Sequence, residues 1–178
     1  MGLGRRRRGE RPYVGRRRAA ATRMSSWMAV LGVGLVLPAC SDSALDCEQG
    51  GPARIEDAPF AGSLQIDLGQ LMRVTEGLYI RDDVIGTGQA TFEGAALTVT
   101  YTGWFVDGTQ FDSGQNFDFT LDVSNVIAGW HQGIKGMRQG GTRTIVIGPA
   151  LGYGPCPYRG IPGNSILVFE VELTQVGG

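Results

Sequence analysis

The chain has 178 residues, of which 42% are hydrophobic, and it contains three Cys and one His. This length and apolar content predict one folded domain with an additional segment. The small number of His and Cys residues argues against a zinc site and against a nucleophile–histidine pair. We therefore expect no metal and no cofactor. From residue 40 onward 7 basic residues face 16 acidic ones, a net charge of −9, which argues against a nucleic-acid partner.

The first 39 residues have the pattern of a secretory signal peptide. Nine of the 16 basic residues lie there, followed by an 11-residue apolar run at 27–37, about half the length that spans a bilayer. The run leads into Leu37-Pro38-Ala39-Cys40, which resembles the lipobox of bacterial lipoproteins. We therefore expect residues 1–39 to be removed and Cys40 to be lipidated. Ser41 resembles the outer-membrane sorting signal, which implies anchoring to the outer membrane, facing the periplasm. A buried core segment that ends in Cys is the alternative.

Residues 40–63 are expected to form the lipidated Cys and a flexible linker, because Ser, Asp, Gly and Pro are frequent there and no periodicity is evident. The two other cysteines, Cys47 and Cys156, can pair in an oxidising compartment, and the sequence leaves this pairing open. The folded domain is expected over residues 64–178.

The expected domain is rich in strands. Apolar and polar residues alternate over 64–68, 97–101, 117–121 and 167–173, and this period of two predicts antiparallel strands with one face on a core and one in water. The β-branched segment 142–147 predicts a further strand. Asp107-Gly108 lies between two apolar runs and predicts a hairpin turn.

One segment departs from this pattern. Ile127, Trp130, Ile134 and Met137 are spaced three, four and three apart, so they share one face of a short helix. We interpret His131, off this face, as a solvated helix residue. Many strands and one helix predict an α+β domain in which the helix covers one face of a curved antiparallel sheet.

Aromatic residues come from several of these predicted elements and must lie close together in so small a domain. Two interpretations remain open: a plain aromatic core, or the lining of a pocket, since ligand sites are mostly apolar with a few polar groups. Tyr101 and Tyr153 add hydroxyls and Asp112 adds a carboxylate.

Five motifs occur in the order found in one known family. Residues 99–113 are similar to the Tyr-x-Gly…Asp-Gly-x-x-Phe-Asp-Ser signature of FKBP-type peptidyl-prolyl cis-trans isomerases. Residues 126–130 resemble that family's Val-Ile-x-Gly-Trp helix, and residues 151–154 resemble the Tyr-Gly motif of its flap loop. Residues 161–162 and 167–173 resemble its Ile-Pro pair and closing strand. The resemblance covers most of the expected mature chain and none of residues 1–60.

The resemblance implies five or six strands wrapped around one short helix, and it implies a pocket. The implied catalytic residues are Tyr101, Phe111, Asp112, Tyr153 and Phe169. The implied substrate-binding residues are Phe117, Val126, Ile127, Trp130 and Ile161. Trp130 would form the pocket floor, and the Ile127 N–H and the Tyr153 hydroxyl would bind substrate carbonyls. The implied substrates are X–Pro segments of unfolded or partly folded exported proteins, and macrolides are implied inhibitors.

Rotation about a prolyl amide breaks no covalent bond, so the shortage of nucleophiles is no obstacle. Two departures from the family pattern concern the loops. The loop after Asp112 is short and lacks the Arg that often pairs with this Asp, and the flap carries Cys156 between two prolines. The alternative function is a prolyl-peptide-binding or holdase folding factor with little turnover.

Overall fold

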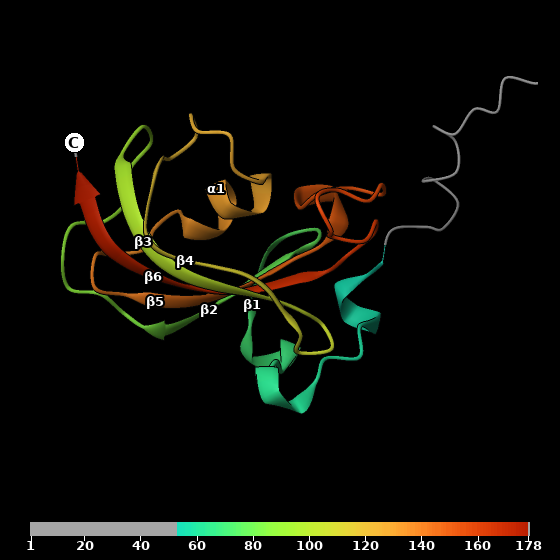
Figure 1. The fold of residues 1–178 in the computed structure, drawn as a ribbon. Helices are drawn as coiled ribbons and strands as arrows, with labels where there is room; N and C mark the ends of the chain where they lie inside the picture. The colour runs from blue at the N-terminus through green and yellow to red at the C-terminus, as the bar shows by residue number, and fades with distance from the viewer. Residues whose placement is uncertain (1–52, 178) are drawn as a thin grey trace, which may run out of the picture. The chain divides into compact units, whose positions relative to one another are not determined.

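The computed structural model describes residues 53–177 and consists of a six-stranded antiparallel sheet with one short α-helix (Figure 1). The sheet order is β1-β2-β5-β6-β3-β4. The strands are β1 (Met72–Thr75), β2 (Leu78–Val84), β3 (Ala96–Phe105), β4 (Gln110–Thr120), β5 (Thr142–Ile147) and β6 (Leu167–Gly177). The helix is α1 (Ala128–Ile134), and four 3-10 turns are η1 (Ile55–Asp57), η2 (Gly62–Leu64), η3 (Leu68–Gln70) and η4 (Pro149–Leu151). The α+β class is confirmed.

The main core lies between the concave face of the sheet and α1 (Figure 1). Alternate residues of β6 contribute to it: Leu167, Phe169 and Val171 are at most 3% exposed. Burying one such side chain stabilises the fold by about 1.5–3 kcal/mol. The predicted strand at 167–173 is confirmed, and β5 has the bounds expected from its β-branched residues.

The helix packs unusually close to β5 because two glycines face the strand. A Cβ on Gly129 would lie 2.5 Å from a carbon of Ile147, and a Cβ on Gly133 would lie 2.8 Å from Ile145. Real Cβ atoms do not approach so closely, so only glycine permits this contact at both positions. The two glycines are four apart and therefore lie on one face of the helix.

The convex face of the sheet is also covered at its centre. Val146 and Val168 are almost fully buried there, together with Ile55 of η1, which is 1% exposed. The 3-10 turns of residues 55–70 lie on this side, opposite α1 (Figure 1). The packed region therefore begins before the expected boundary at residue 64. The expectation that one face of the strand at 167–173 meets water is wrong at Val168, which this layer buries.

The strand predicted over residues 64–68 is wrong, because the segment forms parts of η2 and η3. Leu64, Ile66 and Leu68 nevertheless pack against the convex-face cluster. The Asp67 carboxylate accepts a hydrogen bond from the N–H of Gly69 at 2.9 Å, a local cap that favours a turn over an extended strand. The alternation of apolar and polar residues in this segment therefore reflects packing of the apolar side chains on the convex face of the sheet and not an extended strand.

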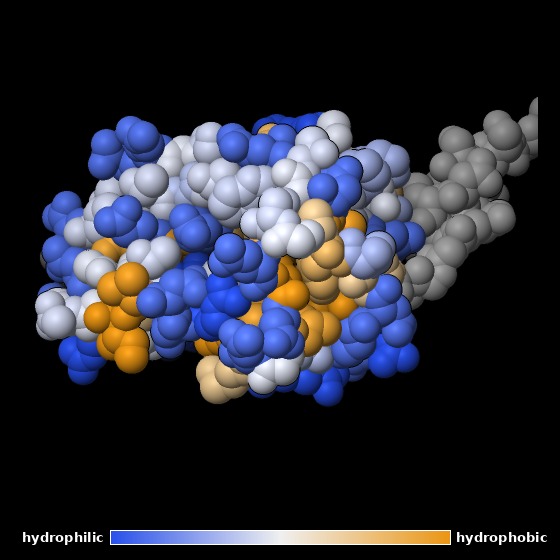
Figure 2. All heavy atoms as spheres, turned by 90° about the horizontal axis from the view of Figure 1, so that it is seen from below, coloured by the Kyte–Doolittle hydropathy of each residue, from blue (hydrophilic) through white to orange (hydrophobic). Residues whose placement is uncertain are grey.

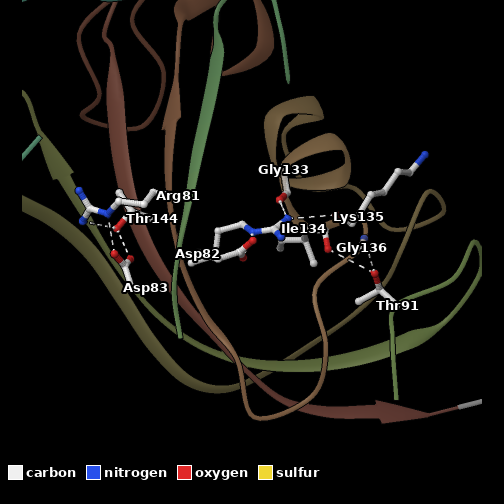
Figure 3. A network of polar contacts seen from close by, with 10 residues as sticks. Arg81, Asp82, Asp83, Thr91, Gly133, Ile134, Lys135, Gly136 and Thr144 are labelled. Carbon is white, nitrogen blue, oxygen red and sulfur yellow. Dashed lines mark hydrogen bonds and ion pairs between the residues drawn. The ribbon is translucent and has the colours of Figure 1, made fainter. Parts of the chain in front are cut away.

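A buried arginine of β5 fixes the end of α1, and Figure 3 labels three residues that it bonds: Asp82, Gly133 and Lys135. Arg143 of β5 is 5% exposed, and its Nε donates to Asp82 Oδ1 at 2.7 Å. Its Nη1 donates to the carbonyls of Gly133 at 2.7 Å and Lys135 at 3.0 Å. These carbonyls end the helix and lack partners within it, and a cation is favoured at this end of the helix dipole.

The underside of the molecule is largely hydrophilic with scattered apolar patches (Figure 2). Within residues 53–177, no helix is long and apolar enough to cross a membrane. The expected signal peptide, the lipidated Cys40 and Cys47 lie outside the described residues. Cys156 is disulfide-bonded, and its pairing with Cys47, which the sequence leaves open, is not tested because Cys47 lies outside the described residues.

Candidate functional site

A cavity of about 430 Å³ lies between α1, the concave face of the sheet and the loop that follows η4. The ten residues singled out from the sequence all line it, and the structure thus brings them to one place. The lining residues are Tyr101, Phe111, Asp112, Phe117, Asn125, Val126, Ile127, Trp130, Tyr153, Tyr158, Arg159, Ile161 and Phe169.

The floor of the cavity is the indole of Trp130, which is 4% exposed. The rings of Tyr101, Phe117 and Phe169 surround it with centroids 4.9, 5.9 and 5.4 Å away, each within 8° of perpendicular. Edge-to-face contacts of this kind add to the stabilisation from burial. The indole Nε1 is buried and has no hydrogen-bond partner among the described residues.

One wall of the cavity forms over a glycine. The rings of Phe111 and Phe169 meet at 83° with centroids 5.5 Å apart. A Cβ on Gly103 of β3 would lie 2.8 Å from an atom of each ring. Gly103 therefore lets the two rings from β4 and β6 approach each other. Gly103 is the glycine of the Tyr-x-Gly pattern in residues 99–113, and this packing explains why a glycine is needed there.

The polar edge of the site is a tyrosine–carboxylate pair. The Tyr101 hydroxyl donates to Asp112 Oδ2 at 2.9 Å, and the N–H of Ser113 donates to Asp112 Oδ1 at 2.9 Å. Burial, the hydrogen bond and the Asp112 charge raise the pKa of Tyr101 to about 12. The hydroxyl thus stays protonated at neutral pH. Within residues 53–177 no Arg or Lys forms an ion pair with Asp112, and Tyr101 takes the place of that partner.

Besides the Trp130 Nε1, two further hydrogen-bond donors at the cavity are unused by the described part of the chain. The Ile127 N–H and the Tyr153 hydroxyl make no hydrogen bond to any described residue, although both residues line the cavity. Burial raises the pKa of Tyr153, the Asp112 charge raises it further, and Arg159 opposes this. The hydroxyl therefore remains a neutral donor, and both groups are available to a carbonyl oxygen in the cavity.

The segment that carries Ile127 is held by His131, which is not the solvated residue expected from the sequence. Its Nδ1 accepts from the N–H of Asp122 at 2.9 Å, and its Nε2 lies 3.0 Å from the carbonyl of Ser124. The imidazole thus bridges α1 to the turn before it. The position of His131 away from the apolar helix face predicted exposure to solvent, but the turn that contains Asp122 and Ser124 contacts this side of the helix.

The sequence analysis missed Asn125, Tyr158 and Arg159 as lining residues. Tyr158 and Arg159 lie in the flap loop, residues 151–161, and neither periodicity nor a resemblance marks a side chain between residues 154 and 161. The usable signal was Gly160, since a two-residue turn ending in Gly can close a hairpin. The bridge Tyr158↔Ile161 shows that this hairpin forms.

Comparison with known proteins identifies the family. Residues 88–174 match the family model of FKBP-type peptidyl-prolyl cis-trans isomerases. The chain is 44% identical over 105 residues to the FK506-binding protein of Neisseria meningitidis serogroup B, covering 56% of this chain and 96% of that protein.

Two solved structures resemble this fold. The crystal structure of FkpA from Escherichia coli matches with a TM-score of 0.56 and 37% identity, over 61% of this chain and 52% of that chain. The crystal structure of AtFKBP13 matches with a TM-score of 0.51 and 35% identity, over 56% of this chain and 92% of that chain. With its aromatic cavity and these relatives, the chain belongs to the FKBP-type family and is a peptidyl-prolyl cis-trans isomerase.

Proposed function

We propose that the cavity holds the prolyl ring over Trp130 and that the Ile127 N–H and the Tyr153 hydroxyl bind the flanking carbonyls. The observation that carries this proposal is the pair of unused donors at the edge of one aromatic cavity. Tyr101, Phe111 and Phe169 form its walls, and Asp112 orients the Tyr101 hydroxyl.

Such a cavity accelerates rotation by preferring the twisted amide. The uncatalysed barrier is about 18–20 kcal/mol because rotation breaks amide resonance. A twisted amide has lost charge separation, so an apolar surrounding suits it better than it suits either planar isomer. A 10⁴-fold acceleration requires about 5–6 kcal/mol of differential binding. The aromatic walls and the two donors supply contacts of this kind without a covalent intermediate.

The floor assignment is tested by the affinity for a prolyl peptide. We expect Trp130→Leu to weaken binding of an Ala-Phe-Pro-Phe peptide at least about tenfold, since an anchor of this size contributes more than about 1.4 kcal/mol. The matched control is Phe119→Leu: Phe119 is 5% exposed and packs 5.7 Å from the Trp130 centroid, but does not line the cavity. Unchanged affinity in Trp130→Leu, or an equal loss in both variants, would contradict the assignment.

We also propose that the enzyme is exported and tethered to the outer membrane by lipid on Cys40, where it acts on X–Pro bonds of exported proteins. The basic lead, the apolar run and the Leu37-Pro38-Ala39-Cys40 motif support this location. Metabolic labelling with a fatty acid should mark the wild-type chain and Cys47→Ser but not Cys40→Ser. Labelling that persists in Cys40→Ser would refute the lipid anchor.

Macrolides are proposed ligands of the same cavity, because the Neisseria relative carries the name FK506-binding protein. FK506 should compete with the prolyl peptide at a single site. Simultaneous binding of both would show that the macrolide lies elsewhere.

A further inference from the structure

The flap loop carries a cationic side chain at the mouth of the cavity on a sharply defined turn. Tyr158 and Ile161 exchange two backbone hydrogen bonds of 2.9 Å, so Arg159 and Gly160 are the central residues of a two-residue hairpin. Their φ angles are +46° and +88°, as a type I′ turn requires. Arg is disfavoured in this left-handed region, where Asn, Asp or Gly is usual. An unfavourable residue held at a site invites a functional explanation.

Arg159 is connected to the cavity through stacked rings. The Tyr158 ring lies parallel to the Tyr153 ring, with centroids 5.2 Å apart and an interplanar angle of 15°. The guanidinium carbon of Arg159 lies over the Tyr158 ring, 5.3 Å from its centroid. A cation over a ring face is attracted by the ring quadrupole. The stack places a positive charge next to the ring whose hydroxyl is proposed to bind substrate.

The charge of Arg159 has no carboxylate partner within residues 53–177. The other charged residue that lines the cavity is Asp112. Both oxygens of Asp112 already accept hydrogen bonds, from Tyr101 and from the Ser113 N–H. The cavity mouth therefore presents an exposed cation that has no carboxylate partner among the described residues.

We infer that Tyr158 and Arg159 form a subsite that selects a carboxylate side chain on a residue adjacent to the proline in the substrate. Arg donates several N–H groups in a planar fork that suits a carboxylate. The inference rests on the proposed binding of the prolyl ring in the same cavity. It predicts a preference for Glu or Asp beside proline over neutral or basic residues.

The test compares acetylated and amidated peptides that differ in one residue, Glu, Gln or Lys, placed before or after Pro. We expect kcat/KM from NMR exchange spectroscopy to favour Glu over Gln by about two- to fivefold in at least one of the two positions, as for an exposed ion pair. Lys should be disfavoured, and the Glu/Gln ratio should approach one in about 1 M salt, where such pairs are screened.

Variants assign the preference to Arg159. Arg159→Asn removes the charge but suits the left-handed backbone, so the variant should fold, and its Glu/Gln ratio should fall to one. Arg159→Lys should retain part of the ratio. Arg73→Gln, which changes the net charge equally on the edge strand β1 outside the cavity, should keep the full ratio.

The affinity of each peptide, measured by calorimetry, separates this inference from the proposed function. A Glu/Gln ratio near one in the wild type at low salt, or the same ratio in Arg159→Asn, would overturn the subsite. Failure of every peptide to bind in competition with the Ala-Phe-Pro-Phe peptide would instead overturn the proposed prolyl site.

Discussion

Removing the hydroxyl of Tyr153 should impair catalysis without loss of stability. Because this hydroxyl makes no hydrogen bond to a described residue, Tyr153→Phe breaks nothing in the folded protein, and the free energy of unfolding should change by less than about 0.5 kcal/mol. In the substrate complex it loses one neutral hydrogen bond of about 0.5–1.5 kcal/mol. That loss corresponds to a decrease in kcat/KM of about two- to twelvefold.

The matched variant is Tyr101→Phe, at the other hydroxyl of the cavity. Here the hydroxyl donates to Asp112 at 2.9 Å, so its removal takes away a hydrogen bond within the protein. Because Asp112 is exposed and water can replace the lost donor, we expect a destabilisation of about 1 kcal/mol. Peptide isomerisation and urea unfolding should be measured on both variants. An undiminished kcat/KM in Tyr153→Phe, or a loss of stability equal to that of Tyr101→Phe, would refute the assignment of Tyr153 as an unused donor.

Arg143→Met should lower the free energy of unfolding in urea by about 1.5–3 kcal/mol, because two helix-end carbonyls lose hydrogen bonds from a charged donor. The Asp82 side chain is 40% exposed, so water can solvate the carboxylate that the substitution leaves unpaired. A loss no larger than in the exposed control Arg73→Met would contradict this. The pH dependence of stability follows from Tyr101, whose pKa is about 12 in the fold against 10.0 ordinarily. Its contribution is fully present below about pH 10 and is lost as pH rises toward 12. Urea unfolding between pH 9 and 11 should therefore show a steeper loss in the wild type than in Tyr101→Phe, and equal slopes would contradict the pKa.

Periodicity predicted the parts of the fold whose residues face one core. The strand β5 and the face of α1 with Trp130 and Ile134 follow from spacing alone, since each needs only a local pattern and one buried side. The alternation in residues 64–68 predicted a strand wrongly, because these residues form parts of two short 3-10 turns whose apolar side chains pack against the convex face of the sheet. Spacing cannot show that a second layer exists.

The site was predictable in its residues but not in its contacts. Ordered motifs identified the aromatic lining, whereas the Arg159–Tyr158 stack depends on a two-residue hairpin within the flap. The role of His131 depends on the chain returning over α1. Both contacts depend on the conformation of a loop, and a loop has no repeating sequence pattern from which its conformation could be predicted. The use of Tyr101 as the partner of Asp112 likewise appears only once β3 and β4 pair.

The most direct test measures cis–trans exchange of an Ala-Phe-Pro-Phe peptide by NMR with the purified protein. If the aromatic cavity favours the twisted amide, exchange should accelerate about 10³- to 10⁴-fold at saturation, with the overall cis/trans equilibrium unchanged, and FK506 should abolish the acceleration. A peptide that binds over Trp130 but exchanges at its uncatalysed rate would contradict the account and would instead identify a binding factor.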